Sequence, residues 1–423
     1  MIPRRLADAT ARVIPNRLGV GFRWLIASSW VSNLGDGFAL AAGPLLVASE
    51  TRFPSLVALA TLLQRLPWLL FAVLAGALAD RLDRVKIVAT VDLARAGVLV
   101  LLALAILSHH ANIALVLVVM FVLGTAEVFS NIASGTLLPA LVARDDLVTA
   151  NARLQAGFVV VYQLAGPAIG AALFAAGMSL PFVGQAVLVT VGALLVAQVK
   201  LRPEEDRAPL PEANRVRAEI AEGFRWVVRH AAVRTLVLTI FTFNITFGAA
   251  WSVLVLWARE RLHLGPVGFG LLTAAGAVGG LAGTVSYGWI VKRVSLGNVM
   301  RIGLIIETFT HLSFALTTVP AVALAIMVVF GAHAYIWGTT SVTVRQRAVP
   351  LALQGRVSSV NSLGVFGGIV IGAAVGGPVA EHWGITAPFW FAFVGSGVFV
   401  VLMWRQLALI AHDEQQPEPQ VPE

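Results

Sequence analysis

Long apolar segments alternate with short polar ones along the whole chain. Twelve of these segments are long enough to cross a bilayer as helices, which takes ~20 predominantly apolar residues each. We expect them at about 23–47, 53–79, 86–108, 111–138, 151–177, 180–199, 233–258, 266–291, 298–317, 320–344, 357–381 and 385–405. The pattern predicts an all-α membrane protein of twelve transmembrane helices.

Three polar stretches divide the chain into two six-helix halves, 23–199 and 233–407. Residues 1–22 form a basic tail, and residues 408–423 have a composition typical of a disordered tail. Residues 200–232 form a linker in which apolar side chains recur every three or four positions, at Val216, Ile220, Phe224 and Val227. This spacing predicts an amphipathic helix on the cytoplasmic membrane face.

Composition and charge support this organisation. Of the 423 residues, 58% are hydrophobic and only 12% are charged, whereas a soluble domain carries about 25% charged residues. Most lysines and arginines fall in segments on one side of the predicted helices, so we expect both termini to be cytoplasmic in a cell (inner) membrane protein. The net charge of +8 therefore reflects topology and not nucleic-acid binding.

Composition also limits the chemistry. The chain has no cysteine, which excludes disulfides and thiolate-ligated metals. No lysine stands in a phosphate-binding loop and no zinc motif occurs. We therefore expect no cofactor, no metal and no enzymatic activity.

A charged turn, Gly76–Lys86, separates the second and third predicted helices. It resembles the G-x-x-x-D-R-x-G-R-R/K loop between helices two and three of the major facilitator superfamily, with matches at Gly76, Asp80, Arg81 and Arg84. The turn departs from that pattern at Asp83, where the family has glycine. The resemblance implies a cytoplasmic gate in which Gly76 lets a helix approach closely and Asp80 faces a helix N-terminus.

Other runs resemble the twelve-helix drug–proton antiporters, in the branch with the macrolide-efflux proteins and the enterobactin exporter. They are Ser32–Gly37, Gly124–Phe129, Leu138–Asn151, Ile220–Trp226 and Arg345–Pro350. Two features depart from that group: helix four carries Glu127 where many members have arginine, and the helix-five motif Gly166, Pro167 and Gly170 ends in Ala171 instead of a second glycine.

The resemblance implies the major facilitator fold, with two pseudo-symmetric halves that rock to give alternating access. It further implies export of small amphipathic compounds, drugs or siderophore-like molecules, driven by protons. A proton-independent facilitator or lysolipid flippase of the same fold remains the alternative. The expected partners are the small-molecule substrate, protons and membrane lipids, and we expect a monomer.

Two acids, Asp36 and Glu127, lie near mid-depth in helices that line the central cavity of this fold. A charge at that depth costs at least ~2.5–3.5 kcal/mol, so we take both as proton-coupling candidates. A structural pair between Asp36 and Arg65 is the alternative. The substrate-cavity candidates are Asn33, Arg65, Asn244, Trp251, His333 and Trp337. For the tryptophans the alternative is core packing, and for His333 it is a buried histidine with its hydrogen bonds satisfied.

Other polar pairs and the glycines receive structural interpretations. We expect Asp92 and Arg95 to form an ion pair near the cytoplasm. We expect Glu307 and His311 to form a local hydrogen-bonded pair on helix nine, which is peripheral in this fold. A glycine ladder at every fourth residue predicts close helix packing; it consists of Gly364, Gly368, Gly372 and Gly376.

The two halves share a weak internal repeat with an offset of 211 residues. The matched positions are Asn33 with Asn244, Gly37 with Gly248, Pro139 with Pro350 and Gly166–Pro167 with Gly377–Pro378. The same offset maps Asp36 onto Phe247 and Glu127 onto Gly338. It therefore predicts that buried acids occur in the first half only.

Overall fold

The computed structural model describes residues 16–201 and 213–409, except for the side chains of 16, 213–220, 352, 408 and 409. In chain order the elements are η1 (Asn16–Leu18), α2 (Gly19–Glu50), α3 (Pro54–Arg81), α4 (Arg84–Leu107), α5 (Ile113–Gly135), α6 (Leu137–Leu141), η2 (Arg144–Asp146), α7 (Leu147–Gly157), η3 (Phe158–Ala165), α8 (Gly166–Ala176), α9 (Leu180–Val196), α10 (Ala213–Arg229), α11 (Ala231–Trp251), α12 (Leu254–Arg261), α13 (Pro266–Val291), α14 (Leu296–Leu316), α15 (Pro320–Ala348), η4 (Leu351–Leu353), α16 (Gln354–Trp383) and α17 (Ala387–Leu409). The η elements are short 3₁₀ helices, except that η3 is π-helical.

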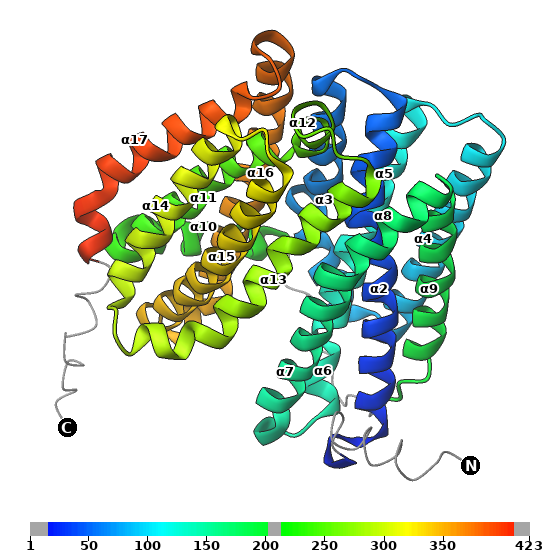
Figure 1. The fold of residues 1–423 in the computed structure, drawn as a ribbon. Helices are drawn as coiled ribbons and strands as arrows, with labels where there is room; N and C mark the ends of the chain where they lie inside the picture. The colour runs from blue at the N-terminus through cyan, green and yellow to red at the C-terminus, as the bar shows by residue number, and fades with distance from the viewer. Residues whose placement is uncertain (1–15, 202–212, 410–423) are drawn as a thin grey trace. The chain divides into compact units, whose positions relative to one another are not determined.

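The prediction of an all-α membrane protein with twelve spanning helices is confirmed. Within the described residues, eleven helical segments are long and apolar enough to cross a membrane, and α9 is a shorter apolar helix. Every regular element described is helical. Figure 1 follows these helices along the chain in colour from blue to red.

The helices form two compact units. The N-unit comprises the chain up to Leu210 together with Ala258–Ala277, and the C-unit comprises Pro211–Trp257 together with the chain from Val278 onward. The boundaries of the predicted halves, tails and linker stay predictions.

In the N-unit, α2 is the central helix and packs against α8, α9 and η3 (Figure 1). The packing is close where glycines remove the side chain. Gly37 lies against the backbone of Gly166 and Tyr162, and Gly170 lies against Phe38. The C-terminal end of α2 is held by Arg259, whose guanidinium donates to the Ala48 carbonyl at 2.6 Å, as suits a cation at a helix C-terminus.

In the C-unit, α11 packs along α16 through the predicted glycine ladder. Gly368, Gly372 and Gly376 each meet the backbone of α11, so the prediction of close packing at these residues is confirmed. On the far side of α11, core residues such as Leu236, Phe243 and Met300 fill the space toward α14. The ladder thus fixes how deeply α16 can sit against α11.

Contacts inside the units correct one part of the predicted repeat. Gly37 meets Gly166 in the N-unit, and Gly248 meets Gly372 in the C-unit. The first members of these pairs differ by 211 residues but the second members by 206. The two Gly-Pro sequences matched at an offset of 211 are therefore not at equivalent positions. The offset of 211 between the Gly-Pro sequences exceeds the offset of 206 between the contacting glycines by five residues, which is about 7.5 Å along an α-helix.

Two predicted helices are interrupted. Helix five is α7, η3 and α8 in succession. Pro167 lacks the N–H that would continue the α-helical ladder, and the N–H of Gly166 donates five residues back, to Val161. Helix seven ends at Trp251, and α12 begins after a short break. Trp257 of α12 is fully buried against Phe314, with ring centroids 5.0 Å apart.

The predicted linker contains α10, which is anchored in the C-unit. Glu222 forms an ion pair with Arg356 at 2.8 Å, and Gly223 lies against the Arg356 backbone. Val227 is buried, whereas Phe224 is exposed. Val216 and Ile220 lie outside the described side chains, so the amphipathic membrane helix stays a prediction.

The charged turn has local contacts that the family pattern does not describe. A Cβ added at Gly76 would meet nothing within 4 Å in the N-unit, and the expected close helix approach there stays a prediction. Asp83, which departs from the family pattern, N-caps α4 by accepting from the backbone N–H groups of Val85 and Lys86. Arg84 donates to the carbonyls of Ala79 and Thr136 and so ties the ends of α3 and α5 to this turn.

Candidate functional site

A polar cavity of about 290 Å³ lies in the N-unit. Residues of α2, α4, α5, α7, η3 and α9 line it, among them Ser28, Ser29, Ser32, Asn33, Asp36, Asp92, Arg95, Ser130, Asn131 and Gln155. This density of polar side chains is unusual for helices that cross a membrane, where polar groups mark pathways for ions or substrates. The cavity is the first candidate site.

Arg95 of α4 contacts two carboxylates in this cavity. One guanidinium nitrogen, Nη1, donates to Asp92 Oδ1 at 3.1 Å, and Nη2 donates to Asp36 Oδ1 of α2. Gln185 of α9 donates a further hydrogen bond to Asp36 Oδ1 at 3.0 Å. The side chains of Arg95 and Asp92 are only 7% and 4% exposed, whereas that of Asp36 is 24% exposed. Asp36 is therefore the carboxylate of this group with the best access to the cavity.

A second charged pair joins α3 and α5. Arg65 and Glu127 approach to 3.9 Å, with side chains 29% and 25% exposed. Both residues also interact electrostatically with Tyr162 of η3, as do Asp36 and Arg95. We call the residues Asp36, Arg65, Asp92, Arg95 and Glu127 the charge cluster. With all members ionised, three carboxylates face two guanidiniums, and the cluster carries one excess negative charge.

These contacts decide between the interpretations of the charged residues. The ion pair between Asp92 and Arg95 is confirmed, but it also includes Asp36. The alternative in which Asp36 pairs with Arg65 is wrong, because Arg65 faces Glu127 instead. Sequence reasoning missed Gln185, a buried glutamine on α9 whose only signal is an amide within an otherwise apolar segment.

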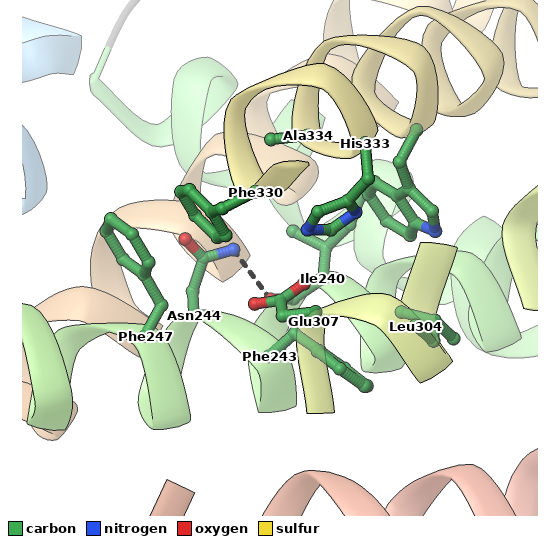
Figure 2. A pocket seen from close by; sticks show the side chains of 10 residues that line it. Ile240, Phe243, Asn244, Phe247, Leu304, Glu307, Phe330, His333 and Ala334 are labelled. Atoms are coloured by element: carbon green, nitrogen blue, oxygen red, sulfur yellow. Dashed lines mark hydrogen bonds between the residues drawn. The ribbon is translucent and has the colours of Figure 1, made fainter. Parts of the chain in front are cut away.

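The C-unit contains a more apolar cavity of about 280 Å³. It is lined by Ile240, Phe243, Asn244, Phe247, Leu304, Glu307, Phe330, His333, Ala334 and Trp337, from α11, α14 and α15. Figure 2 shows the Glu307 carboxylate, the Asn244 amide and the His333 ring around a common space. The Asn244 amide donates to the Ile240 carbonyl at 2.7 Å, which leaves its oxygen available to a ligand.

Glu307 corrects two predictions. Neither ring nitrogen of His311 has a hydrogen-bond partner, so the expected pair between Glu307 and His311 is wrong. Glu307 instead faces the cavity of the C-unit, so the expectation of buried acids in the first half only is also wrong. A signal was present in the sequence: an offset of 212, which relates Gly76 to Gly288, places Glu307 at the position of Arg95.

The family of the chain follows from its sequence as a whole. A family model described as "Transmembrane secretion effector" matches residues 11–422, nearly the full length of the chain.

The chain belongs to the transmembrane secretion effector family.

Characterised and uncharacterised relatives agree with this assignment. The chain is 26% identical over 379 residues to the multidrug efflux pump Tap of Mycolicibacterium fortuitum, covering 86% of this chain and 90% of Tap. It is 26% identical over 304 residues to the uncharacterised MFS-type transporter YvqJ of Bacillus subtilis (strain 168), covering 69% of this chain and 70% of YvqJ. The chain is thus a membrane transporter of the major facilitator superfamily.

Solved structures agree on the fold. A bacterial homologue of the iron transporter ferroportin in an inward-facing state matches with a TM-score of 0.72 at 18% identity, covering 92% of this chain and 98% of the homologue. The nucleoside transporter NupG (D323A mutant) matches with a TM-score of 0.73 at 15% identity, covering 92% and 99%. At these identities the likeness concerns the fold alone.

Within this secretion effector, the predicted cavity residues fall into four groups. Asn33 lines the N-unit cavity, and Asn244, His333 and Trp337 line the C-unit cavity. Arg65 belongs to the charge cluster. Trp251 stacks on Phe247 at 4.6 Å and packs edge-on to His311, so it supports the wall of the C-unit cavity from behind. The roles of these residues in substrate binding stay predictions.

The remaining predicted site residues have structural contacts. Gly166, Pro167 and Gly170 are buried where α8 packs against α2, with no chemically reactive group among them. Asp80 and Arg81 are exposed at the end of α3. Their role as a cytoplasmic gate stays a prediction. Among the described residues, no group of three histidines and acids is arranged to hold a metal ion.

Proposed function

We propose that this transporter exports small amphipathic compounds, drugs or siderophore-like molecules, and that protons drive the export. The substrate would move outward by alternating access while a proton moves inward. A facilitator or lysolipid flippase that uses no protons is the second candidate. The homology to a multidrug efflux pump supports export of drug-like compounds, and the cavities in both units suit ligands with polar and apolar parts.

The observation that carries the coupling proposal is the excess charge of the charge cluster. Arg95 forms ion pairs with two carboxylates, Asp36 and Asp92, and Arg65 pairs with Glu127. An uncompensated charge within a membrane-spanning region is costly, whereas uptake of one proton makes the cluster neutral. The cluster can therefore alternate between a protonated, neutral state and an ionised state with one negative charge.

Asp36 is the best candidate to take up that proton. It lines the cavity, its side chain is more exposed than that of Asp92, and it contacts Arg95 and Gln185. Protonation would weaken its attraction to Arg95. The contact between α2 and α4 would then respond to the proton, as a coupled transporter requires. Glu127 is the second candidate because its pair with Arg65 is loose at 3.9 Å.

An efflux screen in a pump-deficient host first compares export of a dye, a macrolide and a catecholate siderophore. The coupling test then uses purified full-length protein in liposomes. If the monocationic dye ethidium is transported in exchange for one proton, the charges cancel and only the pH gradient drives transport. Each pH unit then supports about a tenfold dye gradient. Asp36→Asn should reduce the ratio of the dye concentrations on the two sides of the membrane to one, while downhill exchange of the dye stays measurable.

One control and two further variants define the outcome. Asp145→Asn changes an exposed carboxylate outside the cluster and should leave the gradient unchanged. Glu127→Gln should lower the gradient or shift the pH optimum. Full proton-driven accumulation in the Asp36→Asn, Glu127→Gln double variant would exclude both residues from coupling. Wild-type protein that equilibrates the dye but never concentrates it would favour the proton-independent facilitator.

A further inference from the structure

The carboxylate of Glu307 lies in an unusual environment. It faces the C-unit cavity from α14, which spans the membrane. Among the described residues, it forms no hydrogen bond and no ion pair, and the lining of its cavity includes no lysine or arginine. The N-unit differs, since there each acid of the charge cluster has an arginine partner.

Other polar groups in the same wall also lack partners. His333 of α15 is only 6% exposed, and neither of its ring nitrogens has a hydrogen-bond partner in the described structure. The indole N–H of Trp337, in the same wall, is likewise buried without a partner. Buried polar groups are normally satisfied, so these two residues are candidates to contact whatever occupies the cavity.

Aromatic rings form a large part of the remaining lining, which also includes Ile240, Leu304 and Ala334. Phe247 and Phe330 are parallel, with ring centroids 6.1 Å apart, and Phe330 packs edge-on to His333 at 5.3 Å. Phe243 and Trp337 complete the apolar wall. Aromatic faces attract cations through their quadrupole, and the attraction is largest where water is excluded.

We propose that the C-unit cavity is a binding site for a small organic monocation, with the cationic head paired to Glu307 and its apolar part held among Phe247, Phe330 and Trp337. The cation supplies the counter-charge that the cavity lacks. The volume of about 280 Å³ lies at the lower limit of ligand sites, so the cavity suits a quaternary or protonated amine with one or two rings. Only the status of this cation as an exported substrate rests on the proposed function; its binding does not.

The test measures binding to the purified full-length protein in detergent, with no gradient. The probe is benzyltrimethylammonium, whose charge is permanent, and its comparator is neopentylbenzene, the uncharged carbon isostere. We expect wild-type protein to bind the charged probe more tightly. Glu307→Gln should weaken that binding by about 10–100-fold, as expected for a lost charge-assisted contact, and leave the neutral isostere unaffected.

Matched variants exclude indirect effects. Glu381→Gln removes an exposed carboxylate at the end of α16 and should not change binding of either probe. Phe330→Leu should weaken binding of the charged probe by about 2–30-fold while changing the neutral one less, because it removes an aromatic face. If Glu307→Gln does not yield folded protein, Phe330→Leu and the charge-retaining Glu307→Asp decide whether the cavity binds the cation as proposed. In that case Glu307→Asp should keep the preference for the charged probe.

Several results would overturn the proposal. They are equal affinity of both probes for wild-type protein, unchanged binding of the charged probe by Glu307→Gln, or equal losses for both probes in Phe330→Leu. Failure of proton-driven export in liposomes alongside intact Glu307-dependent binding would refute the proposed coupling and leave this site standing. The two proposals are therefore tested separately.

Discussion

The two arginines of the charge cluster should differ strongly in their contribution to stability. Arg95 is 7% exposed and serves two carboxylates, so Arg95→Gln would leave both without a cation. Removing one partner of a buried ion pair costs about 3–5 kcal/mol. Arg65 is 29% exposed and lies 3.9 Å from a single partner, and pairs of that kind contribute about 0–1 kcal/mol. Arg65→Gln is therefore the matched control for Arg95→Gln.

Thermal unfolding in detergent, followed by intrinsic tryptophan fluorescence, measures this difference. On the scale known for domains of about 200 residues, 1 kcal/mol shifts the melting temperature by about 2–4 °C. Arg95→Gln should then lower it by about 6–20 °C, against at most about 4 °C for Arg65→Gln. Adding Asp36→Asn to Arg95→Gln should restore part of the loss, because it removes one of the two unpaired carboxylates.

Equal melting temperatures for the two single variants would refute this reasoning. Rescue of a destabilised Asp36→Asn protein by Arg65→Gln would refute it more directly, since it would mean that Asp36 and Arg65 are partners.

Three further predictions concern the scaffold. Asp83→Ala should destabilise the protein by about 0.5–2 kcal/mol because α4 loses its N-cap, while Asp83→Ser should retain most of the stability; both are measured by the same melting assay. Gly372→Val should abolish folded protein on gel filtration because its side chain would run into the α11 backbone at Ile245, whereas Gly364→Ala, where a Cβ would meet only ordinary contacts at 3.8 Å and beyond, should be tolerated. Reporter fusions should place both termini and residues 200–232 in the cytoplasm and His109 outside, and a fusion that places the linker outside would contradict the predicted topology.

The positions that sequence predicted well are those fixed by depth along a helix. Asn33 and Asn244, matched by the repeat, line the cavities of their respective units. Asp36 also lines a cavity, as its mid-depth position predicted. Length and hydropathy set the depth of a residue in the membrane almost by themselves, so these positions could be derived without any contact information.

The predictions that failed are those that required knowing which way a helix is turned. The structural alternative for Asp36 paired it with Arg65, but the residue that Asp36 contacts is Arg95. Glu307 faces a cavity and not His311, although the spacing of four suited a pair. A rotation of about 100° separates neighbouring residues of an α-helix, so a small error in helix orientation changes the partner completely. Only packing between helices fixes that angle.

The π-helical segment η3 has a consequence for sequence changes in this helix. An i→i+5 turn accommodates one residue more than an α-helical turn, so everything after η3 is shifted by one position. A continuous α-helix through the same residues would put Ala165 and Ile169 where Gly166 and Gly170 now meet α2. Ile169 could not fit against the Phe38 backbone, where even a Cβ would clash. Shortening η3 by one residue would keep the glycines in place, so this is a point in a spanning helix where a deletion should be better tolerated than a substitution of glycine.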